Sequence, residues 1–292
     1  MFYLVSWFVQ CLLILLSVAF FTLFERKVIG LFHLRLGPNK VSFIGIIQPL
    51  LDAFKLLSKQ SITPLRSNKL AYSVSPLLSL FISLFVWITM PSIYSFTSLS
   101  YSLFIFFCVS SVLVFGVLFG GWSSNSKYSL MGSLRSIAQS ISYEAVFRTL
   151  LIFFMLIMVR YSISSYRISF SLFRVLFLPI WTICTLAETH RAPFDFRESE
   201  SELVSGFNTE YSGLNFALVF LSEYGVLLYS CVLIRVLFVP LSYSRVVTLT
   251  FFTLLISFVF IWIRVTFCRF RYDKLMIISW KVLLPAVLLF FA

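Results

Sequence analysis

The chain has 292 residues, of which 60% are hydrophobic and 12% are charged, and its mean hydropathy is +0.99. Because soluble domains carry about 25% charged residues, this composition excludes an ordinary soluble protein and predicts an all-α polytopic membrane domain over residues 1–292. The net charge of +12 does not indicate nucleic-acid binding, because the sequence has no basic run and its Lys and Arg residues lie between apolar segments.

Eight apolar segments are long enough to cross a membrane as helices, which takes about 20 residues each. The first is MFYLVSWFVQCLLILLSVAFFTLF, which we expect to be retained as a helix. It lacks the basic start of a signal peptide and is longer than a signal-peptide core. The other spans are predicted at residues 70–90, 102–120, 130–158, 168–187, 214–238, 246–264 and 275–291.

The connection after the first span, residues 25–69, contains the segment GIIQPLLDAFKLLSK. Gln48, Asp52, Lys55 and Lys59 share one stripe of a helix, apolar residues cover the other side, and Pro49 suits a first helical turn. This pattern predicts a short amphipathic helix lying in the membrane interface. The helix is either a surface anchor, or a docking site for a peripheral partner or an entrance for a lipid-like ligand.

The distribution of basic residues predicts the orientation. Connection 25–69 is rich in Lys and Arg, whereas the next connection, PSIYSFTSLSYS, has none. Basic connections stay on the inner side of a membrane. The first connection and the fifth, residues 188–213, are therefore predicted inside, with both termini outside.

The fourth span, LMGSLRSIAQSISYEAVFRTLLIFF, is polar on two sides. Arg135 and Gln139 share one face with Ser142, and Glu144 and Arg148 lie roughly opposite. Such a helix cannot face lipid with either side, so we expect it inside the bundle. Glu144 precedes Arg148 by four residues, a spacing that allows an ion pair. The pair is either structural or functional, and ionisable groups at membrane depth favour function.

The fifth connection holds more than half of the chain's eleven acids: Glu188, Asp195, Glu198, Glu200, Glu202 and Glu210. Pro193 is expected to end the fifth span, and ESESELVSGFNTE is expected to form a short helix. On that helix Glu200 would lie on the apolar side, opposite Glu198 and Glu202.

Together with Glu144 and Glu223 inside spans, these acids would run from membrane depth to the inner surface. Carboxylates this close are expected to titrate as a coupled set, and water-bridged carboxylates can carry protons. The alternative is an ordinary acidic loop.

The five Cys and two His residues are far apart, and no C-x-x-C pair occurs. We therefore expect no metal site, iron–sulfur site or disulfide framework in this chain alone. Any redox centre would belong to a partner.

Four segments carry a family resemblance: FERKVIGLFHLRLGPNKVSFIGIIQPLLDAFKLLSKQ, SNSKYSLMGSLRSIAQSISYE, LAETHRAPFDFRESESELVSGFNTEY and FRYDKLMIISWKVLLP. They resemble the signature segments of the NADH–ubiquinone oxidoreductase chain 1 family, in the expected order and with the spans between them covering nearly the whole chain. Members of that family are membrane subunits of respiratory complex I.

The resemblance implies a cofactor-free, eight-span subunit of the mitochondrial inner membrane that helps to form the quinone channel. Quinone is then the substrate, and FMN and iron–sulfur clusters belong to partner subunits. The implied partners are the peripheral quinone-site and iron–sulfur subunits, the antiporter-like membrane subunits and membrane lipids. The acidic connection would face the matrix, and both termini the intermembrane space.

The resemblance also implies residue roles. The positions that match the family's quinone channel are Arg26, Arg35, Asp52, Arg135, Tyr143, Arg191 and Arg271. Those that match its proton-relay acids are Glu144, Glu188, Asp195, Glu198, Glu200, Glu202, Glu210 and Glu223.

Two departures from the family pattern lie in the acidic connection. His190 stands where the family usually has Asn, and Ser199 replaces a Gly. His190 adds a group that titrates near neutral pH. The alternative functions are a stand-alone secondary transporter or ion channel, which would favour inverted repeats that the halves do not display, or a membrane subunit of a related hydrogenase-type complex.

Overall fold

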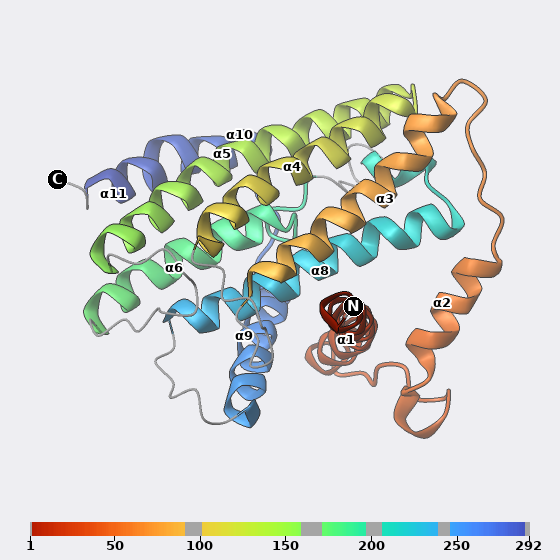
Figure 1. Cartoon of the computed structure of the whole chain (residues 1–292), viewed down its shortest axis with the longest axis horizontal. Coiled ribbons are helices and arrows are strands. Elements are labelled where there is room, and N and C mark those ends of the chain that lie inside the picture. Colours follow the sequence, from red (N-terminus) through yellow and green to blue (C-terminus); the bar gives the residue numbers. More distant parts are fainter. Residues whose placement is uncertain (1, 91–100, 159–170, 197–205, 239–245, 290–292) are drawn as a thin grey trace.

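The computed structural model describes residues 2–90, 101–158, 171–196, 206–238 and 246–289. Within these ranges every regular element is a helix (Figure 1), which confirms the all-α class. Within the described residues, each of the eight predicted spans contains helix. The helices are α1 (Phe2–Phe32), α3 (Lys69–Val86), α4 (Ser102–Ser123), α5 (Lys127–Met158), α6 (Ser171–Glu188), α8 (Gly213–Phe238), α9 (Val246–Thr266), and a last run made of α10 (Tyr272–Ile277), the π-helical η5 (Ile278–Leu283) and α11 (Leu284–Leu289).

Of the helices in the described ranges, α1, α3, α4, α5 and α8 are long and apolar enough to cross a membrane by length and composition. The apolar helices α6 and α9 and the last run occupy the other three predicted spans. A helix closes most of its backbone hydrogen bonds within one segment, as the apolar interior of a bilayer requires.

The first helix extends beyond the predicted end of the first span. The apolar run stops near residue 24, but α1 continues to Phe32 and carries Glu25 and Arg26 on its last turns. Hydropathy marks where a helix leaves the apolar layer, not where its hydrogen-bonded backbone ends. Here the helix continues because Glu25 is buried against other helices. The predicted connection 25–69 is therefore helical in its first part.

After α1 the chain forms the short 3-10 helix η1 (Phe43–Gly45) and then α2 (Gln48–Ser58), with Pro49 in the first turn as predicted. Gly45 has a φ of +76°, and a Cβ at this position would overlap the carbonyl of Pro38, so only glycine fits this turn. The apolar side of α2 is exposed at Leu50, Phe54 and Leu57. The interfacial position of this helix stays a prediction.

Helix α3 packs on α4 and α8, and α4 packs on α5. In Figure 1, α3, α4 and α5 lie side by side, α8 runs along α3, and α1 is seen nearly end-on beside α8. Helix α6 packs against α5, and α9 contacts α8 and α1. Short helix α2 lies at the edge, where it contacts α1 and α8.

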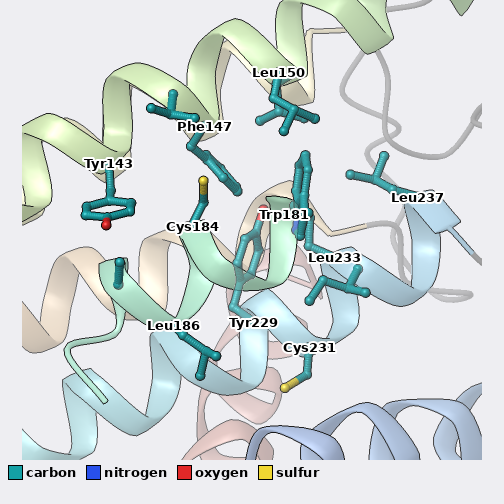
Figure 2. Packing of buried hydrophobic residues seen from close by; sticks show 14 of the residues in the cluster. Tyr143, Phe147, Leu150, Trp181, Cys184, Leu186, Tyr229, Cys231, Leu233 and Leu237 are labelled. Carbon is teal, nitrogen blue, oxygen red and sulfur yellow. The ribbon is translucent and has the colours of Figure 1, made fainter. Parts of the chain in front are cut away.

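The core lies between α5, α6 and α8. Figure 2 shows Phe147 and Leu150 of α5 facing Trp181 of α6, with Tyr229 and Leu233 of α8 completing the cluster. The ring centroids of Phe147 and Trp181 are 4.5 Å apart. Lipid is as apolar as the side chains, so moving a side chain from lipid to a helix interface gains little hydrophobic free energy. Close aromatic packing of this kind holds the helices together instead. This packing fixes the parts of α5 and α6 that carry the acids.

Helix α6 ends at Glu188, and residues 189–196 form a turn that contains Pro193, as predicted. The turn is tied to α5, because the Nε2 amide of Gln139 donates to the carbonyls of Ala187 at 2.9 Å and Phe194 at 2.8 Å. Of the helix predicted over 198–210, the described end is a 3-10 helix, η4 (Gly206–Glu210). Residues 197–205 lie outside the described ranges.

Candidate functional site

A small cavity with polar groups in its wall lies between α4, α5 and the exit of α6. Its volume is about 20 Å³, counted as the space open to the centre of a water molecule. About 10–15 Å³ by this measure holds one water, provided that polar groups surround it. The walls supply such groups; they are made by Ser110, Leu113, Val114, Val117, Ser136, Ile137, Ser140, Glu144, Glu188 and His190.

Glu144 is the buried acid of this cavity, with 9% of the residue exposed. Arg148, one turn later on α5, donates a charge-assisted hydrogen bond to its Oε1, so the predicted ion pair is confirmed. The hydroxyl of Ser110 on α4 lies 3.3 Å from the same oxygen. A carboxylate thus faces a water-sized space with a cation and a hydroxyl beside it.

Glu188 and His190 reach the cavity from the exit of α6. Both residues are half-buried. Because they line the same cavity as Glu144, the structure brings together two of the acids that the sequence proposed as a series. His190 was noted in the sequence only as a departure, and its position in the cavity wall was not predicted.

The other polar side of α5 is also inside the bundle, as expected. Gln139 is fully buried against the turn after α6. Tyr143 is fully buried too, and its hydroxyl donates to the carbonyl of Leu275 on α10 at 3.2 Å. Tyr143, expected in a quinone channel, therefore lies in the helix core in this structure.

Three further acids of the proposed series are described, and none of them lines the cavity: Asp195, Glu210 and Glu223 are half-buried elsewhere. The backbone carbonyl of Glu210 accepts a hydrogen bond from the Tyr72 hydroxyl, and Tyr72 stacks on Tyr211 with ring centroids 4.5 Å apart. Glu198, Glu200 and Glu202 lie outside the described residues.

The remaining predicted channel residues fall into separate groups. Arg26 of α1 pairs with Asp52 of α2 at 2.8 Å, and Gln48 donates to the same carboxylate at 3.0 Å. Arg35 follows α1 and is exposed. Arg271, also exposed, precedes α10 and pairs with Asp273 at 3.2 Å. Arg135 is half-buried on α5.

Arg191 lies in a second, smaller group that the sequence analysis missed. Its guanidinium carbon is 4.2 Å from the ring centroid of Tyr224 on α8, a cation–π distance. The Tyr224 hydroxyl donates to Glu25 at 2.7 Å, and Arg264 of α9 pairs with the same carboxylate. The only sequence signal was an acid directly after an apolar run, in FERK.

This second group borders a cavity of about 10 Å³, measured in the same way. Apolar side chains form most of its wall, which is made by Phe21, Glu25, Leu186, Arg191, Leu227, Phe260, Ile261 and Arg264. Among the described residues, no three His, Cys, Asp or Glu side chains are grouped as metal ligands.

Comparison with known proteins places these features in a family. The model of the family described as NADH dehydrogenase matches residues 5–292. NADH-ubiquinone oxidoreductase chain 1 of Aedes aegypti is 46% identical over 279 residues, which cover 93% of this chain and 88% of that protein. The chain 1 protein of Heterololigo bleekeri is 44% identical over 297 residues, covering 98% of this chain and 94% of its own length. That of Artemia franciscana is 44% identical, covering 97% and 95%. The chain therefore belongs to the NADH dehydrogenase family, together with these NADH-ubiquinone oxidoreductase chain 1 proteins.

Proposed function

We propose that this chain, as a subunit of a proton-pumping NADH:ubiquinone oxidoreductase (complex I), forms the quinone-access channel and links quinone reduction to proton translocation. The names of its relatives support the subunit assignment and ubiquinone as the substrate. The observation that carries the coupling role is the cavity shared by Glu144 and Glu188 on facing helices. Ionisable side chains are costly at membrane depth, so two of them beside one water-sized space are best explained by function.

In this proposal the chain is a multi-pass protein of the mitochondrial inner membrane. Its partners are the peripheral subunits that hold FMN and the iron–sulfur clusters, and the antiporter-like membrane subunits. Electron transfer would take place on those peripheral subunits, and this chain would contribute the path for the quinone and for protons.

The cavity can move a proton without any change in the bonds between heavy atoms. A protonated carboxyl at Glu188 gives its proton to a water, and the same water gives a proton to the ionised carboxylate of Glu144. Arg148 stabilises that carboxylate while it is ionised. The hydroxyls of Ser136 and Ser140 donate to backbone carbonyls and keep free lone pairs, so they can accept hydrogen bonds from the water.

The quinone path is proposed along the second group. Apolar walls from α1, α8 and α9 would suit an isoprenoid tail, and the polar atoms of Glu25, Arg191 and Arg264 would suit a quinone headgroup. Because this cavity is only water-sized here, a quinone ring would pass only after the Arg191 and Tyr224 side chains swing aside.

The coupling role is tested with Glu144→Gln and Glu188→Gln in the assembled complex, reconstituted into vesicles. Each change keeps the shape of the side chain and removes its ability to hold and release a proton. We expect both variants to lose most quinone reduction coupled to proton translocation. Asp273→Asn is the matched control, because Asp273 is an exposed acid outside the proposed path. Wild-type turnover with a wild-type proton-to-electron ratio in both glutamine variants would contradict the proposal.

Co-purification separates this role from that of a stand-alone transporter or channel. The proposal expects the solubilised chain to bring down partners that oxidise NADH and contain iron–sulfur clusters. A chain that runs alone and still conducts ions would favour the alternative.

A further inference from the structure

We propose that His190 is a proton-exchange residue of the Glu144–Glu188 cavity and carries protons between that cavity and the surface at the exit of α6. The inference rests on the proposed coupling function. It extends that function to a side chain outside the acid series.

The position of His190 supports this role. The residue lines the same water-sized cavity as Glu144 and Glu188. Its Nδ1 atom is buried, whereas the residue as a whole is only half-buried. Glu188 is half-buried too, so this part of the cavity wall lies near the accessible surface at the exit of α6.

The charged side chains nearest to His190 come from α5, from the end of α6 and from the turn that follows. Glu188 on α6 and Glu144 on α5 are the acids of the shared cavity, and Arg148 on α5 neutralises part of the charge of Glu144. Arg191 and Asp195 follow in the same turn. From α4 the cavity wall receives only the hydroxyl of Ser110 and aliphatic side chains. Imidazole is the side chain whose ordinary pKa, about 6.5, allows exchange near neutral pH.

The backbone at His190 is left-handed, with a φ of 50°. Outside glycine, Asn, Asp and His are the residues most enriched in this conformation. The turn therefore restricts which side chains fit at the cavity wall. Two substitutions at His190 therefore suit a test. Asn favours the same backbone conformation but has no titratable group, whereas Asp favours the same conformation and has one.

His190 can pass on a proton without any net change in its own protonation. A protonated Glu188 passes its proton to a cavity water, and that water passes a proton to the unprotonated ring nitrogen of neutral His190. The imidazolium side chain then rotates, and the same nitrogen releases the proton to water on the accessible side. When the ring rotates back it has its first tautomer again, because one nitrogen both takes up and releases the proton. One proton crosses, and no electron moves.

The test compares His190→Asn with His33→Asn in the assembled complex. These are the only two histidines of the chain, and His33 is exposed just after α1. NADH-driven quinone reduction and proton translocation are measured in vesicles from pH 5.5 to 8.5. Rates are normalised to NADH oxidation by an acceptor that takes electrons before the quinone, which corrects for any loss of assembly.

We expect His33→Asn to match the wild type at every pH. His190→Asn should lose the limb of the pH profile near about 6.5. Its coupled rate should fall several-fold, less than the ~10²–10⁴-fold typical of a positioned acid–base group, because proton transfer is only one of the slow steps. His190→Asp should recover part of the lost rate and move the limb to lower pH.

A wild-type pH profile and rate in His190→Asn would overturn the inference, as would an Asp variant no better than the Asn variant. If Glu144→Gln and Glu188→Gln lose coupling while His190→Asn does not, only the role of His190 is wrong. If all of these variants are coupled like the wild type, the carboxylate path itself is wrong.

Discussion

Arg264 on α9 donates a charge-assisted hydrogen bond to the buried carboxylate of Glu25 on α1, across 239 positions of sequence. Tyr224 on α8 donates to the other carboxylate oxygen at 2.7 Å. One acid therefore joins three helices beside the cavity that Arg191 borders. This explains why α1 does not end where its apolar run ends.

The Glu25–Arg264 pair makes a prediction about stability. Glu25 is 6% exposed, so Arg264→Gln alone would leave a buried carboxylate without its cation. Removing one partner of a buried pair typically costs about 3–5 kcal/mol, and we expect the lower end or less here because Arg264 is 33% exposed. The double variant Glu25→Gln/Arg264→Gln should recover part of the loss. The measurement is the thermal unfolding of the complex in a double-mutant cycle.

The exposed pair Arg271–Asp273 is the control for that cycle. Its side chains are 80% and 70% exposed, so Arg271→Gln/Asp273→Asn should change stability by less than about 0.5 kcal/mol. Additive losses at Glu25 and Arg264, with no coupling between them, would show that the pair does not hold these helices together.

Gln139 gives a second prediction, because its amide donates to the carbonyls of Ala187, at the end of α6, and Phe194, in the turn that follows. Gln139→Leu would remove this donor and leave Ala187 with the backbone N–H of His190 at 3.3 Å and Phe194 with that of Phe196 at 3.2 Å. We expect a loss of about 1 kcal/mol for each hydrogen bond removed. We expect faster protease cleavage near residues 189–196 and lower coupled turnover, since this turn carries His190. Gln48→Leu is the control, because Gln48 lies on α2 and donates only to Asp52. Equal protease resistance of Gln139→Leu and the wild type would contradict this account.

The sequence predicted most of the fold because a membrane leaves few choices for an apolar segment. Each run of about 20 apolar residues must close its own hydrogen bonds, and the helix is the way to do so within one segment. The end of α1 could not be predicted in this way. It depends on the contacts of Glu25 with Arg264 and Tyr224. A hydropathy pattern does not show which residues lie close together in space.

The candidate site was predictable where its contacts are local. Glu144 and Arg148 are four residues apart on one helix, so helical geometry alone predicted their ion pair. The shared cavity depends instead on how α4, α5 and α6 pack, and this brings Glu188 and His190 to Glu144 but leaves Glu210 against Tyr72 and away from it. Spacing along the chain carries no signal for such packing.

The contact of α4 with α5 gives a third prediction. A Cβ on Gly121 would overlap the side chain of Ser133 and lie 3.2 Å from the carbonyl oxygen of Ser129. Gly121→Ala should push these helices apart and lower the yield of assembled complex. Gly225→Ala is the matched control, because its Cβ would meet Ser83 at 3.7 Å, an ordinary contact. Blue-native electrophoresis measures assembly, and equal yields from the two variants would show that α4 and α5 adapt.

The last prediction concerns Arg26 and Asp52, the pair between α1 and α2. Their side chains are 55% and 36% exposed, so Arg26→Gln should hardly change stability. If the pair borders the path by which quinone reaches the cavity, the change removes a contact made equally in the ground state and the transition state. The KM for quinone should then rise by up to about fivefold, the equivalent of about 1 kcal/mol, with kcat unchanged. Lys55→Gln is the control for a general loss of positive charge, because Lys55 is exposed on α2, the helix that carries Asp52. A KM that rises equally in both variants would point to a general surface-charge effect, and an unchanged KM in Arg26→Gln would remove this pair from the quinone path.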